Sequence, residues 1–184
     1  MGRYRARDLV NAPTLISWLR VPLAAAFPFT HPHPIASLAV LAAAGLTDVV
    51  DGFVARRFGL ATPTGAVVDG ITDKLFVGVV LATLVVTGKL GTLDVVLLGT
   101  REIGELPLVL WLALDVDARR RKAVEDRANV FGKAATTLQF AVVVLTLLGS
   151  RYQALGLWLA GMIGACAALS YWLRALAGAR AEAR

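Results

Sequence analysis

The sequence predicts an all-α integral membrane protein with six transmembrane helices and both termini in the cytoplasm, forming a single domain over residues 1–184. The first observation behind this prediction is composition, because 57% of the residues are hydrophobic and only 17% are charged, whereas soluble domains carry about 25% charged residues. The second is the spacing of apolar stretches along the chain. The third is an alternation of basic and non-basic connections between them.

Six apolar stretches are separated by short gaps. A helix needs roughly 20 apolar residues to cross the hydrocarbon core. A chain of 184 residues therefore has room for about six such spans. The predicted spans are, in chain order, Ala12–Pro28, Ile35–Val54, Gly65–Gly88, Thr92–Leu114, Val130–Gly149 and Tyr152–Leu173.

Arginine is concentrated in alternate gaps, which predicts the orientation. The N-terminal segment, the pair Arg56-Arg57, the hydrophilic loop Asp115–Arg127 and the C-terminal segment are basic, while the other gaps carry only Lys89 and Arg151. By the positive-inside rule the basic gaps and both termini are cytoplasmic. The basic start followed by an apolar run resembles a signal peptide, but we expect it to lead uncleaved into the first span, because Arg20 interrupts the run and more spans follow.

Charge and cysteine content narrow the expected partners. The formal net charge of +6 is explained in a membrane protein by topology and by anionic lipid headgroups, so we expect membrane lipids and no nucleic acid as partners. Cys166 is the single cysteine, which excludes an intramolecular disulfide and a cysteine-based metal site.

The second and third predicted spans contain four aspartates where ionised groups are costly, namely Asp48, Asp51, Asp69 and Asp73. The first two are three residues apart and the last two are four apart, so each pair projects from one face of its helix. The second span ends and the third begins at the same membrane surface. We therefore expect the four carboxylates to converge near the cytoplasmic side.

Convergent carboxylates repel one another unless a cation lies between them. Mg²⁺ or Mn²⁺, as one ion or a bridged pair, suits oxygen ligands of this kind, and the absence of nearby histidine and cysteine argues against zinc. One alternative is that the aspartates form structural salt bridges with the basic residues Arg20, Arg56, Arg57 and Lys74. Another is a proton or ion transporter, which would need polar groups through the other half of the membrane.

The full spacing is Asp48-x-x-Asp51-Gly52-x-x-Ala55-Arg56, eight residues, then Gly65-x-x-x-Asp69-x-x-x-Asp73. It resembles the signature of the CDP-alcohol phosphotransferase family at every position. The resemblance implies that Asp48, Asp51, Asp69 and Asp73 hold the metal and that Asp73 is the general base. It implies that the CDP moiety is bound by Gly52, Ala55, Arg56 and Gly65.

What the resemblance implies for activity is the metal-dependent transfer of a phosphatidyl group from CDP-diacylglycerol to an alcohol, with release of CMP. Local matches such as Arg101-Glu102-Ile103 and Gly132-Lys133 are similar to phosphatidylglycerophosphate synthases, which use glycerol-3-phosphate, and also to cardiolipin synthases of the eukaryotic type, which use phosphatidylglycerol. Ala135 and Val109 stand where phosphatidylglycerophosphate synthases commonly carry further cationic residues. Both acceptors therefore remain possible, and glycerol-3-phosphate is favoured.

The acceptor is expected to contact a set of residues outside the aspartate cluster: Thr14, Arg101, Arg127 and Lys133. For Arg101 the alternative is an internal ion pair with Glu105, four residues further along the same helix. For Lys133 the alternative is an interfacial side chain that reaches toward water. The resemblance also implies a homodimer. The Ala- and Arg-rich composition is typical of a prokaryotic protein, so we expect a plasma membrane location. The positive-inside topology predicts an active site that faces the cytoplasm.

Overall fold

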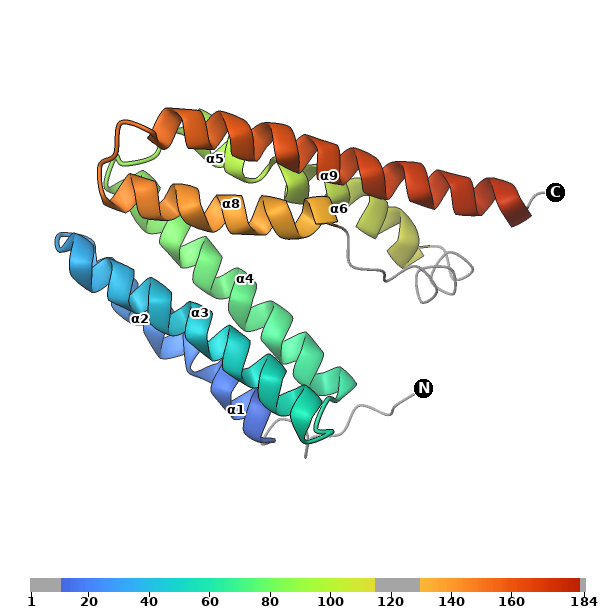
Figure 1. The fold of residues 1–184 in the computed structure, drawn as a ribbon, viewed down its shortest axis with the longest axis horizontal. Coiled ribbons are helices and arrows are strands. Elements are labelled where there is room, and N and C mark those ends of the chain that lie inside the picture. Colours follow the sequence, from blue (N-terminus) through green and yellow to red (C-terminus); the bar gives the residue numbers. More distant parts are fainter. Residues whose placement is uncertain (1–10, 115–129, 183–184) are drawn as a thin grey trace. The chain divides into compact units, whose positions relative to one another are not determined.

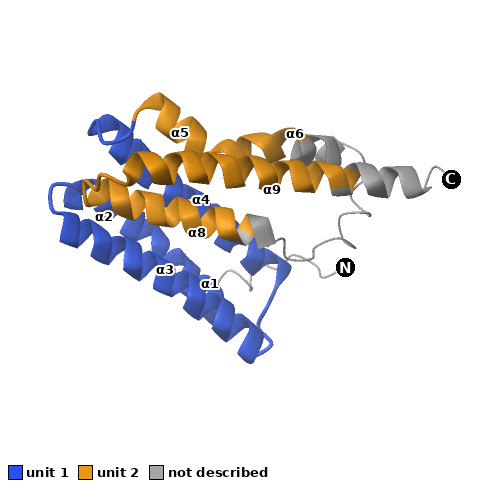
Figure 2. Cartoon of the chain, turned by 45° about the horizontal axis from the view of Figure 1, so that its top comes forward, with its two compact units in different colours: residues 1–90 blue, residues 91–184 orange. Residues whose placement is uncertain are grey.

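The computed structural model describes residues 11–114 and 130–182, which are almost entirely helical and contain no strand. The chain forms two compact units, residues 1–90 and residues 91–184, and each is described below by itself (Figure 2). The prediction of an all-α protein is confirmed for the described residues. A single domain over the whole chain stays a prediction.

Helices occupy all six predicted spans, and two of these spans are each divided into two helices (Figure 1). The first span is α1 (Ala12–Trp18) with α2 (Arg20–Thr30), and the fourth is α5 (Thr92–Leu98) with α6 (Thr100–Leu114). The undivided spans are α3 (Pro34–Arg57), α4 (Pro63–Val86), α8 (Val130–Leu147) and α9 (Gln153–Glu182). The first division has a clear local cause, because Pro22 has no N–H to donate to the carbonyl of Trp18 one turn earlier.

Two of the described helices are long and apolar enough to cross a membrane. These are α3, with a mean hydropathy of 1.8, and the Gln153–Leu173 part of α9, with a mean hydropathy of 1.6. A shorter apolar segment, Ala134–Leu147, lies in α8. These helices agree with a membrane protein, while the number of six spans and the cytoplasmic termini stay predictions.

In the first unit, α1 and α2 pack against both α3 and α4. The apolar centre of this unit includes Phe27 of α2 and Phe76 of α4, whose rings meet edge to face at a centroid distance of 6.5 Å. Phe27 is fully buried. The segment formed by α1 and α2 is therefore the common packing partner of the two helices that carry the aspartates.

The connection from α3 to α4 reverses the chain within a few residues, and the sequence explains both of its ends. Gly59 has a φ of +65°, and the N–H of Leu60 donates to the carbonyl of Ala55 over 3.0 Å, the arrangement of a glycine-terminated helix. Thr62 then caps α4 by accepting from the N–H of Gly65 over 3.1 Å, with Pro63 in the first turn. This short reversal makes α3 and α4 run in opposite directions (Figure 1).

In the second unit, α9 packs against α5, α6 and α8. Small residues permit close approach: a Cβ added to Gly104 of α6 would lie 2.6 Å from the Cβ of Ala168 of α9. The indole N–H of Trp172 donates to the carbonyl of Gly104 over 2.9 Å. Close backbone approach through small residues is the usual way in which helices associate in membranes.

Candidate metal and nucleotide site

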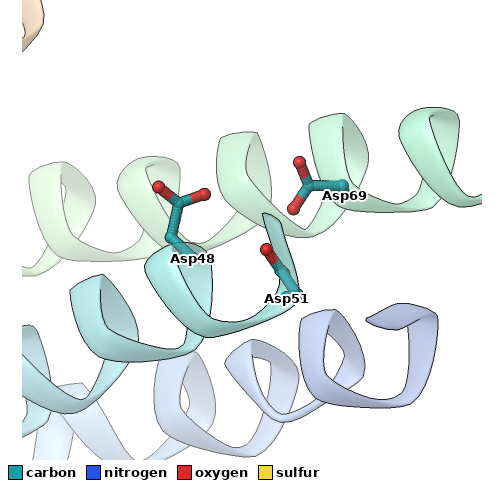
Figure 3. Close-up of side chains that lie close together, drawn as sticks. All are labelled: Asp48, Asp51 and Asp69. Carbon is teal, nitrogen blue, oxygen red and sulfur yellow. The ribbon is translucent and has the colours of Figure 1, made fainter. Parts of the chain in front are cut away.

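The four aspartates lie where α3 and α4 pass each other in the first unit. Asp48 and Asp51 project from α3, and Asp69 projects toward them from α4 (Figure 3). Asp73 lies one turn further along α4. The expected convergence is therefore present, and it results from helical spacing on two helices joined by a tight reversal.

Three of the four carboxylates are close enough to share one cation. Asp48, Asp51 and Asp69 each offer an oxygen, and these oxygens lie within 4.8 Å of one another. Carboxylate oxygens at this separation can approach a hard divalent ion with small side-chain adjustments. The donor set fits Mg²⁺ or Mn²⁺. Asp73 does not belong to this group of three, although its side chain is 55% exposed and faces the same guanidinium as the others.

That guanidinium belongs to Arg20, the first residue of α2, and it forms ion pairs with all four aspartates. Nη2 donates to Asp48 over 3.0 Å and to Asp51 over 2.9 Å. Nη1 donates to Asp69 over 2.5 Å and lies 3.3 Å from Asp73. The cluster and its arginine together carry a formal charge of −3, since four negative groups contact one positive group.

Asp51 is the most enclosed of the four, and a second donor reaches it. Its residue is only 4% exposed, and its Oδ2 accepts from the hydroxyl of Ser17 over 2.7 Å as well as from Arg20. Ser17 is itself buried in α1 and also donates to the carbonyl of Pro13. Donors on both sides of the break between α1 and α2 thus fix the position of one carboxylate.

The residues implied to hold the CDP moiety lie on the same two helices. A Cβ added to Gly52 would lie 3.2 Å from Nη1 of Arg56, so the Arg56 guanidinium folds back over the bare backbone of α3. A Cβ added to Gly65 would lie 3.1 Å from the hydroxyl oxygens of both Thr14 and Thr62. Ala55 is half-buried on α3. Polar side chains therefore lie directly against both glycines, Arg56 at Gly52 and the two threonines at Gly65.

Arg101 belongs to the second unit, where it joins α6 to α8. Its Nε donates to Glu105 over 3.0 Å, and its Nη1 donates to the carbonyl of Gly132 over 3.3 Å and to the hydroxyl of Thr136 over 2.7 Å. The pair with Glu105, the alternative to acceptor binding, is present. A role in acceptor binding stays a prediction.

A second polar contact of this unit lies at the break between α5 and α6. The side-chain amide of Gln139 donates to the carbonyl of Leu98 over 2.6 Å and to Glu102 over 3.0 Å. A broken helix leaves carbonyls without partners, which is costly in an apolar medium. Gln139 supplies one of the missing donors.

The remaining predicted residues are placed as follows. Thr14 is fully buried on α1 in the first unit. Lys133 lies on α8, but its side chain is outside the described residues, and Arg127 is outside them altogether together with the rest of the loop Asp115–Arg127. Ala135 of α8 is 1% exposed.

Arg20 is not among the residues that the sequence predicts for the metal site, and it is expected there only as one of several possible salt-bridge partners. Among the described residues, the ion pairs of the four aspartates are all made by Arg20, and none is made by Arg56, Arg57 or Lys74. Ser17 was not singled out. The available signal was an arginine inside an apolar stretch, which always requires a partner in a membrane.

The chain is similar in sequence to known proteins. A sequence model described as CDP-alcohol phosphatidyltransferase matches residues 9–172. The chain is 41% identical over 108 residues to a probable phosphatidylglycerophosphate synthase of Mycobacterium tuberculosis, covering 56% of this chain and 52% of that protein. It is 40% identical over 112 residues to the CDP-diacylglycerol–glycerol-3-phosphate 3-phosphatidyltransferase of Pseudomonas fluorescens, covering 56% and 57%.

The enzyme of the same name from Escherichia coli is 33% identical over 141 residues, covering 72% of this chain and 74% of that protein. The chain spans about half the length of the Mycobacterium relative that it matches. The family match, by contrast, extends over most of the chain and includes every residue of the aspartate cluster together with Arg20. On that match, the chain belongs to the CDP-alcohol phosphatidyltransferase family.

Proposed function

We propose that this protein is a phosphatidyltransferase that transfers the phosphatidyl group of CDP-diacylglycerol to glycerol-3-phosphate, giving phosphatidylglycerophosphate and CMP. The observation that carries the proposal is the convergence of Asp48, Asp51 and Asp69, each of which offers an oxygen within 4.8 Å of the others. Their spacing resembles the signature of the family to which the chain belongs. The names of the relatives from Pseudomonas and Escherichia support glycerol-3-phosphate as acceptor.

Asp48, Asp51 and Asp69 would hold the divalent cation, and Asp73 is the fourth carboxylate of the proposed metal site. Mg²⁺ or Mn²⁺, bound as a pair of ions, would neutralise the charge of the pyrophosphate and favour departure of CMP. Arg56 has a planar fork of donors suited to a phosphate, and the small residues Gly52, Ala55 and Gly65 would allow the nucleotide to approach the backbone.

Asp73 is suited to the role of general base. Its side chain is 55% exposed, so an acceptor hydroxyl can reach it, and it lies outside the group of three carboxylates that could share one cation. The carboxylate takes the proton of the acceptor hydroxyl, the acceptor oxygen bonds to the lipid-proximal phosphorus, and the bond from that phosphorus to the CMP oxygen breaks. No covalent enzyme intermediate is required.

The residues that we propose as contacts of the acceptor are Thr14, Arg101, Lys133 and Arg127. We also propose six transmembrane helices, cytoplasmic termini, a site open to the cytoplasmic leaflet of a prokaryotic plasma membrane, and a homodimer. These extend the finding that α3 and α9 are long and apolar enough to span a membrane.

The experiment is CMP release by the detergent-purified full chain with CDP-diacylglycerol and one acceptor at a time, with Mg²⁺, with Mn²⁺ and with EDTA. We expect release with glycerol-3-phosphate that EDTA abolishes. Release with phosphatidylglycerol alone would instead assign cardiolipin synthesis. Metal-independent release, or none with either acceptor, would contradict the proposal, and a cation flux in vesicles would then favour the transporter alternative.

A further inference from the structure

Arg20 is the most buried charged residue described in the first unit, and no step of the proposed reaction uses it. Its residue is 1% exposed, and it stands at the first position of α2, directly after the break that Pro22 imposes on the first span. A buried charge is retained only where it is paired. Arg20 satisfies this condition through the four aspartates.

The two terminal nitrogens of Arg20 divide the cluster by helix. Nη2 contacts Asp48 and Asp51, which are both on α3, whereas Nη1 contacts Asp69 and Asp73, which are both on α4. A guanidinium is rigid and planar, so it fixes the separation of the groups on its two arms. A lysine ammonium is a single point and cannot hold two helices at a set distance in this way.

Arg20 contacts the four carboxylates from their buried side. Arg20 engages one oxygen of each carboxylate, Oδ1 of Asp48, Asp69 and Asp73 and Oδ2 of Asp51. Arg20 is almost closed to solvent, whereas the side chains of Asp48 and Asp69 are 54% and 40% exposed. The guanidinium therefore lies beneath the carboxylates, and the carboxylates open away from it.

We propose that Arg20 is a positioning residue that stays beneath the carboxylates and pre-arranges them for the divalent cation. This inference rests on the proposed function, since it concerns the metal site of that reaction. Without Arg20, mutual repulsion would spread the carboxylates of α3 and α4 apart, and a cation would have to reassemble them. Groups that orient metal ligands from behind change metal affinity by roughly 10–100-fold when they are removed.

The opposite role is a competitor, in which Arg20 occupies the place of the cation and must leave before metal binds. The two roles predict opposite signs. Loss of a positioning residue weakens metal binding, whereas loss of a competitor strengthens it. The burial of Arg20, its place directly after a proline-induced break and its contact with four partners favour a side chain that stays.

The test is Mn²⁺ binding to the detergent-purified full chain without substrate, measured by electron paramagnetic resonance of the free ion. The variants are Arg20→Gln and Arg20→Lys. The control is Arg57→Gln, which removes one positive charge at the exposed end of α3. We expect Arg20→Gln to weaken Mn²⁺ binding by roughly 10–100-fold, Arg20→Lys to weaken it by a smaller factor because the charge is kept and the fork is lost, and Arg57→Gln to bind as the unaltered protein does.

Unchanged or tighter Mn²⁺ binding by Arg20→Gln would overturn the proposal, and so would full affinity in Arg20→Lys. If Arg20→Gln is not recovered folded, Arg20→Lys alone decides. CMP release, measured separately on the unaltered protein, distinguishes the two proposals. If Mn²⁺ binding depends on Arg20 but no CMP is released, only the proposed function is contradicted. If CMP is released but Mn²⁺ binding does not depend on Arg20, only this inference is contradicted.

Discussion

The guanidinium of Arg20 and the carboxylate of Asp51 lie 2.9 Å apart with side-chain exposures of only 1% and 5%. Among the described ion pairs, this is the one in which both partners are nearly closed to solvent. The pair of Arg20 with Asp48 has a similar distance, 3.0 Å, but Asp48 is 54% exposed. Burial, rather than distance, thus separates the two aspartates of α3.

Asp51→Asn is expected to destabilise the protein more than Asp48→Asn. Asp51→Asn removes the one buried partner of Arg20, at a cost of up to about 3 kcal/mol, whereas a solvent-screened pair contributes under about 1 kcal/mol. Arg20 keeps three other carboxylate partners in either variant. Asparagine keeps the shape, and its amide oxygen can still accept from Ser17. The measurement is thermal unfolding in detergent with EDTA, so that metal binding does not contribute. Equal changes in unfolding temperature for Asp51→Asn and Asp48→Asn would show that burial does not make the Asp51 pair the more stabilising one.

Asp73→Asn is expected to lower the rate of CMP release by roughly 10²–10⁴-fold, the usual contribution of a general base, while Mn²⁺ binding is retained. The reason is that Asp73 lies outside the group of three carboxylates that can share a cation. The matched control is Asp94→Asn in the first turn of α5, whose side chain can still accept from the N–H of Gly91.

Loss of Mn²⁺ binding in Asp73→Asn would show that Asp73 is first of all a metal ligand. A normal rate of CMP release would remove it from the role of base. Reduced release by Asp94→Asn to the same degree would indicate a general effect of losing a carboxylate.

Gly52→Ala is expected to raise the KM for CDP-diacylglycerol by about tenfold. The added methyl group would lie 3.2 Å from Nη1 of Arg56 and displace this guanidinium, at about the energy of one hydrogen bond, ~1.4 kcal/mol. Gly45→Ala on the same helix is the control, because a Cβ there meets nothing within 4 Å. Similar KM values for the two variants would argue against a role of Arg56 in holding the nucleotide.

Arg101 and Glu105 are expected to stabilise the second unit jointly. Arg101 also reaches Gly132 and Thr136 on α8, so Arg101→Gln should lower the unfolding temperature more than Glu105→Gln. The double variant should show a coupling of roughly 0.5–3 kcal/mol between them. Arg151→Gln, at an exposed position before α9, is the control.

Additive effects of Arg101→Gln and Glu105→Gln would mean that the pair contributes nothing to stability. If Arg101→Gln instead leaves the unfolding temperature unchanged and raises the KM for glycerol-3-phosphate, the acceptor-binding role is the correct one. A structural role of Arg101 would therefore change the unfolding temperature, whereas an acceptor-binding role would change the KM for glycerol-3-phosphate.

Much of the helical framework could be predicted because its signals are local. Thr62 and Pro63 start α4, and Gly59 ends the turn after α3, so the boundaries near the site follow from capping chemistry. The divisions at Leu19 and Gly99 were not predicted, since hydropathy averages over a window and does not register one interrupted hydrogen bond. Pro22 was a visible sign of the first division.

The sequence by itself determined the class of the protein, the helices that carry the aspartates and the convergence of the carboxylates, because composition, helical period and a short reversal act over neighbouring residues. Only the tertiary structure decided which basic residue pairs with the carboxylates. Arg20 precedes Asp48 by 28 residues and Asp69 by 49, and several basic residues were equally eligible partners by type. Packing of α1 and α2 against both α3 and α4 selects Arg20, since a buried charge must lie where all its opposite charges can reach it.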